Sequence, residues 1–340
     1  MPIEFGELSG CALDSPWAPV LVDLATVAMN KHGSARIRHR LETRGAPLPA
    51  TTLVSGTGAV VERSGSEGPA PAVGGCSPAV RQAGAVIDLS PWPGLSVTAP
   101  LGGGHRNDVY EVRGRDRLVA RRTRRTAPAM EWELDLLEFL DHCGFVVPHT
   151  VPTADGRRSA GGVVVQTWLH GREPVGGDWA LVASELGRLH RLTAGWANQR
   201  PGFRSTRELQ RESRGGDIDL DAMPDHAVHL CRQAWAALSA GPDCVIHGDP
   251  GPGNVRMSGG RVGFLDWDES RVDHADLDLA EIPGGPLRGH RAAVASNAID
   301  AWEAACSVAI THRPGHGVQH RGGQRGPGDG RGQHRLRELP

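Results

Sequence analysis

Lysine is almost absent from this sequence of 340 residues. Lys31 is the only lysine among 37 basic residues, and Tyr110 is the only tyrosine. Any cation that binds phosphate in the main domain must therefore be an arginine or a histidine. The formal net charge of -2 gives the whole chain no electrostatic preference for nucleic acid or for an anionic membrane.

The sequence also lacks cysteine pairs and long apolar runs. Its six cysteines are scattered without a CxxC pair, which indicates neither a zinc ribbon nor a disulfide framework. The best apolar run, at 18–29, contains Asp23 and is too short to span a bilayer. Acidic residues precede any basic residue at the N-terminus, which is wrong for a secretory signal. We therefore expect a soluble cytoplasmic protein with no membrane segment.

Composition divides the chain into four segments. Residues 1–85 are an N-terminal extension, with one or two helices within 16–44 and then a Gly-, Pro- and Ser-rich linker that we expect to be poorly ordered. A compact domain follows, with one lobe over 86–170 and another over 171–306. Residues 307–340 are rich in Gly, Arg and His without apolar periodicity, which predicts a disordered tail. An RGG-like tail can bind RNA weakly, but we expect no nucleic acid partner.

The periodicity of apolar residues predicts a sheet-rich lobe followed by a helix-rich lobe. Strands are expected within 85–101, 107–112 and 117–122, a helix over 130–143, and a hairpin over 146–169. In the second lobe, helices are expected over 178–195, 221–241 and 288–305, with two short strands between 244 and 265. This order is typical of an α+β fold with a cleft between its lobes.

The segment 244–270, CVIHGDPGPGNVRMSGGRVGFLDWDES, gathers acids, an asparagine and a histidine between two apolar runs. Carboxylates crowded in this way cost free energy unless a partner such as a cation holds them. Phosphoryl transfer needs a carboxylate that accepts the proton of an attacking hydroxyl, and oxygen ligands for magnesium. Asp249 and Asn254 lie in a loop full of glycine and proline, and Asp266 follows an apolar run. Asp249, Asn254 and Asp266 are therefore candidates for the proton acceptor and the magnesium ligands.

VIHGDPGPGN and GFLDWDE resemble motifs of the aminoglycoside phosphotransferase and choline kinase family, small-molecule relatives of the protein kinases. The resemblance implies a protein-kinase-like two-lobe fold, with an antiparallel sheet in the N-lobe and a helical C-lobe. It further implies Asp249 as the catalytic base, Asn254 and Asp266 as magnesium ligands, and His247 as a residue that orients the loop.

DHADLDLA resembles the closing element of the same family, although His274 stands where a glycine is usual. The resemblance gives Asp268 and Asp278 supporting roles. Bracing of loops explains these two acids equally well. In GRLHRL, which resembles the family's LxxLH helix, His190 is interpreted as a packing residue.

The segment VTAPLGGGHRNDVYEV has the order strand, glycine-rich turn, strand. Such a turn lets backbone N–H groups approach phosphates without a Cβ in the way. It resembles the family's GGxxNxVY loop, which implies that Gly103, Gly104 and Asn107 bind the nucleotide.

A cation on the third strand should pair with an acid on the following helix. Arg121 and Arg122 are the candidates, and strand alternation turns them to opposite faces. The family pattern favours Arg121, whereas the register of protein kinases favours Arg122. On the helix, the spacing of Glu133 to Leu136, Leu137 and Leu140 resembles that of the family's acid, which favours Glu133 over Glu131.

The strand VVVQTWL is predicted to be the hinge between the lobes, whose backbone would bind adenine. Gln166, Thr167 and Trp168 are the candidates, and an ordinary buried strand is the alternative interpretation.

Together these features predict an ATP- or GTP-dependent phosphotransferase with Mg²⁺, acting on a hydroxyl of a small metabolite or an aminoglycoside-like compound. A nucleotide-binding protein of the same fold without turnover is the competing hypothesis, motivated by the lysine-free third strand. Asp217, Asp219 and Asp221 suit an aminated substrate, and a solvated loop explains them as well.

Overall fold

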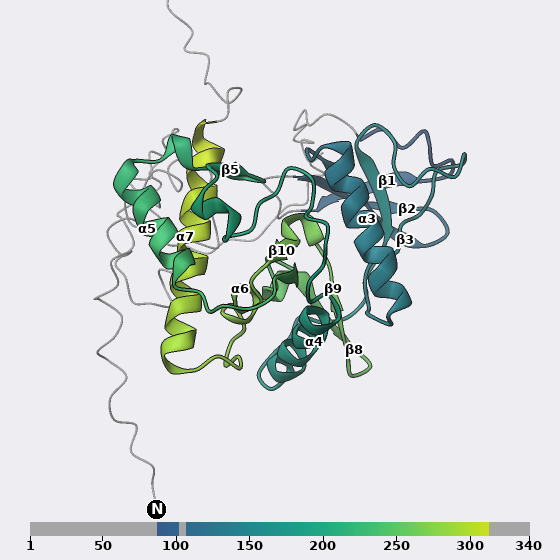
Figure 1. Cartoon of the computed structure of the whole chain (residues 1–340). Coiled ribbons are helices and arrows are strands. Elements are labelled where there is room, and N and C mark those ends of the chain that lie inside the picture. Colours follow the sequence, from purple (N-terminus) through teal and green to yellow (C-terminus); the bar gives the residue numbers. More distant parts are fainter. Residues whose placement is uncertain (1–86, 102–106, 313–340) are drawn as a thin grey trace, which may run out of the picture.

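The structure is a computed structural model that describes residues 87–101 and 107–312 (Figure 1). The predicted N-terminal helices and linker lie outside these residues. So do the glycine-rich turn with Gly103 and Gly104 and the tail beyond residue 312.

An antiparallel sheet and one helix make up the first lobe. The strands lie in chain order across the sheet: β1 Ser96–Leu101, β2 Asn107–Arg113, β3 Arg117–Thr123 and β4 Val163–Thr167. Helix α3 spans Ala127–His142 and begins three residues before the predicted start. The Thr126 side chain accepts a hydrogen bond from the Ala129 N–H, and Pro128 occupies the first turn. Proline tolerates that position because its missing N–H would have no partner there.

The predicted strand over 85–101 is wrong in its first half, because β1 begins only at Ser96. The residues before it form turns in which the Trp92 N–H bonds to the Leu89 carbonyl. Pro91, Pro93 and Gly94 explain the difference. Gly94 has φ +84°, a left-handed conformation that favours glycine.

The predicted hairpin over 146–169 forms only its second strand, β4. The segment before it bonds to β4 at Val151 N–H to Val165 carbonyl and Thr167 N–H to His149 carbonyl. Pro148 and Pro152 interrupt that segment, and proline cannot donate to a ladder. The hydrogen bonds that do form nevertheless cover the edge of β4 opposite β3.

The second lobe contains four helices among the described residues. They are α4 Asp178–Leu192, α5 Asp225–Ala236, α6 Asp276–Leu279 and α7 Gly289–His312. Short strands pair around them: β5 Arg214–Gly215 with β6 Ile218–Asp219, β7 Cys244–Ile246 with β10 Arg271–Asp273, and β8 Val255–Ser258 with β9 Arg261–Phe264. Short 3-10 turns include one at Trp267–Glu269, directly after Asp266.

The prediction that disorder begins at residue 307 is wrong for its first residues, because α7 continues to His312. The stretch from 307 to 312 contains no glycine or proline, and the first breakers are Pro314 and Gly315. A helix continues until such a residue removes its hydrogen bonds or its conformational restraint.

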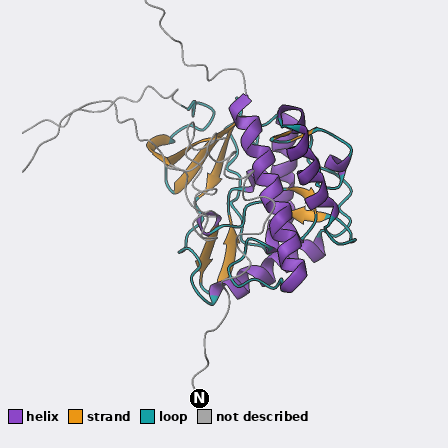
Figure 2. Ribbon diagram, turned by 90° about the vertical axis from the view of Figure 1, so that its left-hand side faces the viewer, coloured by secondary structure: helices purple, strands orange, loops and turns teal. Residues whose placement is uncertain are grey.

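Helix α3 joins the two lobes. Met130 and Leu134 pack on Val164 of the sheet. One turn further on, Leu136, Leu137 and Leu140 belong to the core that includes side chains of α4, β8 and β9. A separate core lies between α5 and α7. The arrangement of sheet and helices is visible in Figure 2. Because α3 packs on both lobes, a polar side chain on its buried face, such as Glu133, lies at their junction.

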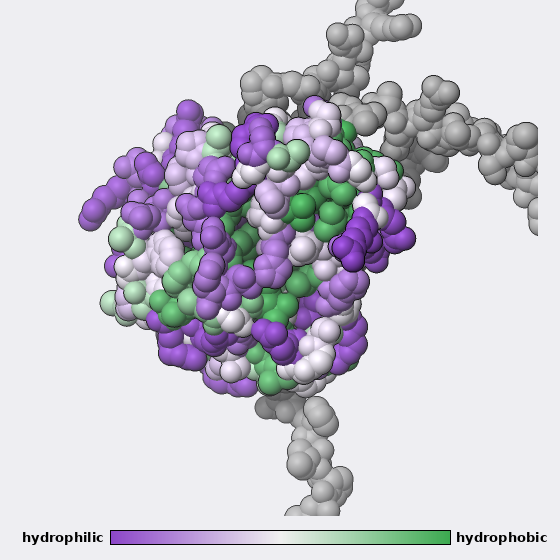
Figure 3. All heavy atoms as spheres, turned by 90° about the vertical axis from the view of Figure 1, so that its right-hand side faces the viewer, coloured by the Kyte–Doolittle hydropathy of each residue, from purple (hydrophilic) through white to green (hydrophobic). Residues whose placement is uncertain are grey.

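Apolar side chains gather near the centre of the face seen in Figure 3, with hydrophilic ones around them. The large apolar side chains exposed among the described residues are Val97, Val175, Leu181 and Leu192, which come from both lobes. In the described part of the chain, none of the helices combines the length and the apolar character needed to cross a bilayer.

Candidate active site

A buried carboxylate fixes the loop that carries Asp249. Asp278 is fully buried and accepts hydrogen bonds from the backbone N–H groups of His247 (2.9 Å) and Gly248 (2.8 Å). The Nε2 of His190 lies 2.9 Å from an oxygen of the same carboxylate. His190, interpreted from sequence as a packing residue, thus holds the carboxylate that holds the loop.

His247 connects this loop to the strand that precedes Asp266. Its Nδ1 accepts from the Asp249 N–H (3.2 Å), so Nε2 carries the proton and donates to the Leu265 carbonyl (3.1 Å). The ring also packs beside Phe264 and Trp267. The side chain therefore orients the loop, as expected for His247.

Gly248 brings the loop against the turn that follows Asp266. Its φ is +85°, and a Cβ there would lie 2.6 Å from the Glu269 carbonyl oxygen. Any side chain would push the two segments apart. The glycine of the HGD motif is thus required by close packing in this chain.

Asn254 joins the loop of Asp249 to Leu265, the residue directly before Asp266. Its Nδ2 donates to the Asp249 carbonyl (3.0 Å), and its own carbonyl accepts from the Leu265 N–H (3.0 Å). The three residues expected at the catalytic centre are therefore held together by contacts between their segments.

Asp266 has φ +60° and is the only non-glycine residue in the described part of the chain with a positive φ. Such a backbone conformation costs free energy and occurs preferentially at functional sites. The side chain reaches solvent, yet burial by surrounding protein raises its pKa, Arg121 opposes this rise, and Asp268 and Glu133 add to it. Its carboxylate forms no hydrogen bond or ion pair with the described residues.

The residues present fit a magnesium ion that also binds phosphates. Among the described residues no cluster of three His, Cys, Asp or Glu side chains could hold a metal ion. Magnesium, however, is usually held by one or two carboxylates together with substrate phosphates and water. Asp266 offers an unpaired carboxylate, and the amide of Asn254 is oriented by its bond to the Asp249 carbonyl. A nucleotide would supply the remaining ligands.

Arg121, rather than Arg122, meets the acid of α3. The Arg121 guanidinium is buried and pairs through Nη2 with Glu133 and through Nη1 with Asp268 (3.4 Å). Arg122 lies on the opposite face of β3, where it pairs with Asp108 at 2.6 Å. The geometry therefore selects Arg121 as the arginine that faces the junction.

Glu133 is likewise the acid of α3 that lies at the junction, since it is buried and bound by two arginines. Glu131 instead pairs with Arg158 at the partly exposed side of the helix.

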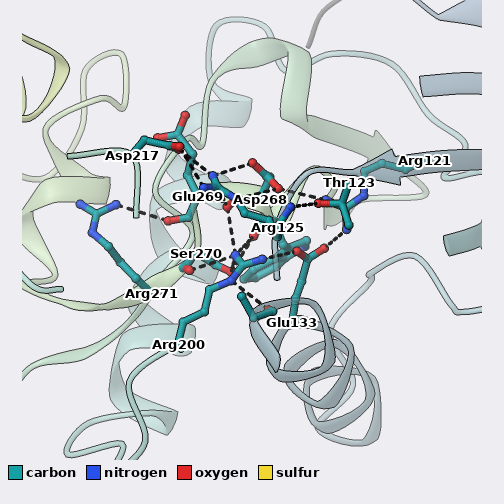
Figure 4. A network of polar contacts seen from close by, with 12 residues as sticks. Arg121, Thr123, Arg125, Glu133, Arg200, Asp217, Asp268, Glu269, Ser270 and Arg271 are labelled. Carbon is teal, nitrogen blue, oxygen red and sulfur yellow. Dashed lines mark hydrogen bonds and ion pairs between the residues drawn. The ribbon is translucent and has the colours of Figure 1, made fainter. Parts of the chain in front are cut away.

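Sequence reasoning missed two arginines of this junction, which Figure 4 shows from close by. Arg125, in the loop before α3, pairs with Asp268 (2.8 Å) and Asp217 (2.7 Å). Arg200, fully buried, donates to Glu133 (2.7 Å). Burial alone would raise the pKa of Asp268, but Arg125 and Arg121 hold it well below its ordinary range. Neither arginine lies in a motif or a periodic pattern that could have marked it.

The acids considered for an aminated substrate are paired within the protein. Both carboxylate oxygens of Asp217 accept from Arg125. Asp219 and Asp221 each lie 3.1 Å from Arg214. An aminated acceptor would have to displace these arginines.

The other predicted nucleotide contacts lie at the edge of the sheet lobe. Gln166 is buried and pairs with Val119 of β3, so its backbone belongs to the sheet. Trp168 follows β4, and the Arg117 guanidinium stacks on its ring at 3.5 Å. Asn107 is buried at the start of β2, and its Oδ1 has no hydrogen-bond partner within the described part of the chain. Gly103 and Gly104 lie outside the described residues.

We expect Asp278→Asn to lower the free energy of unfolding by about 3 kcal/mol at pH 7, because it removes a buried charge that several donors require. The hydrogen bond from His190 lowers the pKa of Asp278 despite full burial. The carboxylate therefore stabilises the fold above the pKa of an unfolded aspartate, about 3.9, and this stabilisation is lost as pH falls through the folded value. Urea unfolding of variant and parent should give a difference that shrinks below about pH 4. If the two proteins differed in free energy of unfolding by the same amount at pH 7 and below about pH 4, this role of Asp278 would be contradicted.

The antiparallel sheet followed by a helical lobe is the two-lobed fold of a kinase-like phosphotransferase. A family model described as "Phosphotransferase enzyme family" matches residues 97–304, and the chain belongs to that family. No curated protein matches the chain.

Solved structures with a similar fold include several kinases of small molecules. Amicoumacin kinase hAmiN, solved with AMP-PNP, Ca²⁺ and Ami, is 17% identical over 63% of this chain and 72% of its own, with a TM-score of 0.45. Spectinomycin phosphotransferase APH(9)-Ia is 15% identical over 60% and 74%, with a TM-score of 0.42. A putative fructosamine-3-kinase from Thermobifida fusca is 20% identical over 62% and 78%, with a TM-score of 0.41. At these values the family assignment rests on the family model.

Proposed function

We propose that this protein is an ATP- or GTP-dependent phosphotransferase that transfers the γ-phosphoryl group to a hydroxyl of a small metabolite or an aminoglycoside-like compound. The observation that carries the proposal is the pair of hydrogen bonds by which Asn254 joins the loop of Asp249 to Leu265, directly before Asp266, whose carboxylate has no partner among the described residues. The proposed location is the cytoplasm, where nucleoside triphosphates are available.

In this proposal Asp249 orients the acceptor hydroxyl and takes its proton as the oxygen attacks phosphorus. The loop positions this carboxylate through Asp278 and His247, which supports the role because a general base must lie within hydrogen-bond reach of its proton. Asp266 and Asn254 would hold magnesium, which neutralises charge on the phosphates when bound.

The sheet lobe would bind the nucleotide. Arg121, braced by Glu133, is proposed to steady the α and β phosphates, with the turn of Gly103 and Gly104 covering them and Asn107 at its end. Adenine contacts are proposed for the backbone that begins at Trp168, because β4 is hydrogen-bonded on both of its edges. Gln166 would then contribute to the nucleotide site from its position within strand β4.

We expect Arg121→Ala to weaken nucleotide binding and to lower the free energy of unfolding by on the order of 3 kcal/mol, because buried acids lose a partner. The matched control is Arg122→Ala, on the opposite face of β3 with a partly exposed partner. We expect it to change the free energy of unfolding by less than about 1 kcal/mol. Calorimetric titration with MgADP and urea unfolding measure the two effects. Equal loss of nucleotide affinity in both variants would contradict the assignment of Arg121.

A second candidate function is nucleotide binding without turnover. Both Nη groups of Arg121 are already bound by carboxylates, and its buried Nε has no partner among the described residues. This arginine must therefore rearrange, or use Nε alone, to reach a phosphate. Such a restriction favours a protein that binds nucleotide but transfers phosphate poorly.

The experiment that separates the two functions is a screen of amino sugars, amino alcohols and sugars by thermal shift and by ATP turnover with Mg²⁺. Turnover that depends on one class of hydroxyl compound would support the phosphotransferase. Magnesium-dependent ATP binding without turnover across the panel would favour the second candidate.

A further inference from the structure

The guanidinium of Arg200 is completely buried between the two lobes. Towards helix α3 it donates from Nε to the Ala129 carbonyl (3.1 Å) and from Nη2 to the Glu133 carboxylate (2.7 Å). Towards the second lobe, Nη1 lies 3.0 Å from both the Trp267 and the Asp268 carbonyl oxygens. One side chain thus binds the helix of Glu133 and the turn that directly follows Asp266.

The two residues before Arg200 make the same connection. The Asn198 carbonyl accepts from the indole N–H of Trp132 on α3 (3.0 Å). The Gln199 side chain bonds to Val272 twice, accepting from its N–H (2.9 Å) and donating to its carbonyl (2.8 Å). We call residues 198–200 the connector. It bonds to α3 through Asn198 and Arg200, and to the segment 267–272 through Gln199 and Arg200.

The bonds of the connector fix the distance between α3 and the segment 267–272. Arg200 donates to the backbone carbonyls of Trp267, Asp268 and Ser270, and its planar fork sets the angle between its partners. Burial lowers the pKa of Arg200, and Glu133 opposes this effect. A buried charge with this many partners has few alternative positions.

We propose that Arg200 is a positioning residue that sets the placement of Asp266 relative to Glu133, and hence to Arg121, before any nucleotide binds. The inference rests on the proposed function, because Asp266 and Arg121 matter as a pair only if both bind one magnesium nucleotide. Arg121, which would bind phosphate, and Asp266, which would bind the metal, then keep a fixed relative position, and α3 does not have to move when the nucleotide binds.

The test uses the full-length protein with Arg200→Lys. The ammonium group keeps the charge but cannot span both Glu133 and the turn carbonyls. We expect the ratio of the ADP dissociation constants without and with Mg²⁺, measured by calorimetric titration, to fall about tenfold, the effect typical of removing a partner of a metal ligand. Amide hydrogen exchange of the nucleotide-free protein should rise in both 129–137 and 266–272.

The stability control is Leu220→Ala, which empties part of the core between α5 and α7. It should lower Tm without changing the magnesium ratio. If Arg200→Lys does not fold, Trp132→Phe replaces it. This change removes the bond to Asn198 and alters the ring beside the Arg200 guanidinium, so it should act in the same direction with smaller size.

A magnesium ratio equal to that of the parent, or lowered equally in Leu220→Ala, would overturn the positioning role. Amide hydrogen exchange that rises in only one of the segments 129–137 and 266–272 would also overturn the positioning role. If the parent itself shows no magnesium-dependent ADP binding, the proposed function fails, and the exchange measurement still decides whether Arg200 couples the two segments.

Discussion

Replacing Asp249 with asparagine is expected to lower phosphoryl transfer roughly 100- to 10,000-fold, the usual contribution of a positioned general base. Asparagine has nearly the same shape, so the loop held by Asp278 and His247 should keep its conformation. It cannot accept the hydroxyl proton. Nucleotide affinity should therefore stay near that of the parent, with the whole loss in kcat.

The measurement is initial-rate kinetics with the best acceptor of the screen, together with calorimetric titration of MgADP. Asp225→Asn is a matched control, because this aspartate is exposed at the start of α5. It should retain the kcat of the parent. Asp249→Asn that turns over as fast as the parent would show that Asp249 is not the base.

Asp266→Asn is expected to abolish most of the gain in ADP affinity that Mg²⁺ provides, because magnesium prefers a carboxylate and an amide carries no charge. The substitution suits the backbone, since asparagine tolerates the left-handed conformation that Asp266 adopts at φ +60°.

The same variant should be more stable than the parent. Burial raises the pKa of Asp266, so its charged form at pH 7 is less favourable in the folded than in the unfolded protein, and a neutral side chain removes that cost. Tm by calorimetry should rise while magnesium-dependent affinity falls, a trade of stability for function. A fall in Tm with unchanged magnesium dependence would contradict the metal role.

The central residues of the site could be predicted because they lie in one continuous segment. His247, Asp249, Asn254 and Asp266 fall within 244–270, and short loops between β7, β8 and β9 bring them together. Glu133 could be selected because its spacing to Leu136, Leu137 and Leu140 resembles that of the family's acid, and the structure buries it together with these leucines.

The arginine network could not be predicted, because its contacts join distant parts of the chain. Arg200 and Glu133 are 67 positions apart, and Arg125 and Asp268 are 143 apart. Single arginines in segments of mixed charge belong to no periodic pattern or spaced motif from which their contacts could be predicted. Their placement depends on how the lobes pack, which local patterns do not contain.

The errors in the fold prediction came from residues that end regular structure. Prolines shortened the first predicted strand and removed half of the predicted hairpin. The lack of any breaker before Pro314 allowed α7 to continue past the expected end of the domain.

Phosphorus NMR of the full-length protein with ATP, Mg²⁺ and the hydroxyl-compound panel tests the central proposal most directly. The predicted result is ADP together with an equal amount of a phosphate ester on one acceptor class, formed by the parent and strongly reduced in Asp249→Asn. Binding of magnesium ATP without any phosphate ester across the panel, or ester formation that is unchanged in Asp249→Asn, would contradict it.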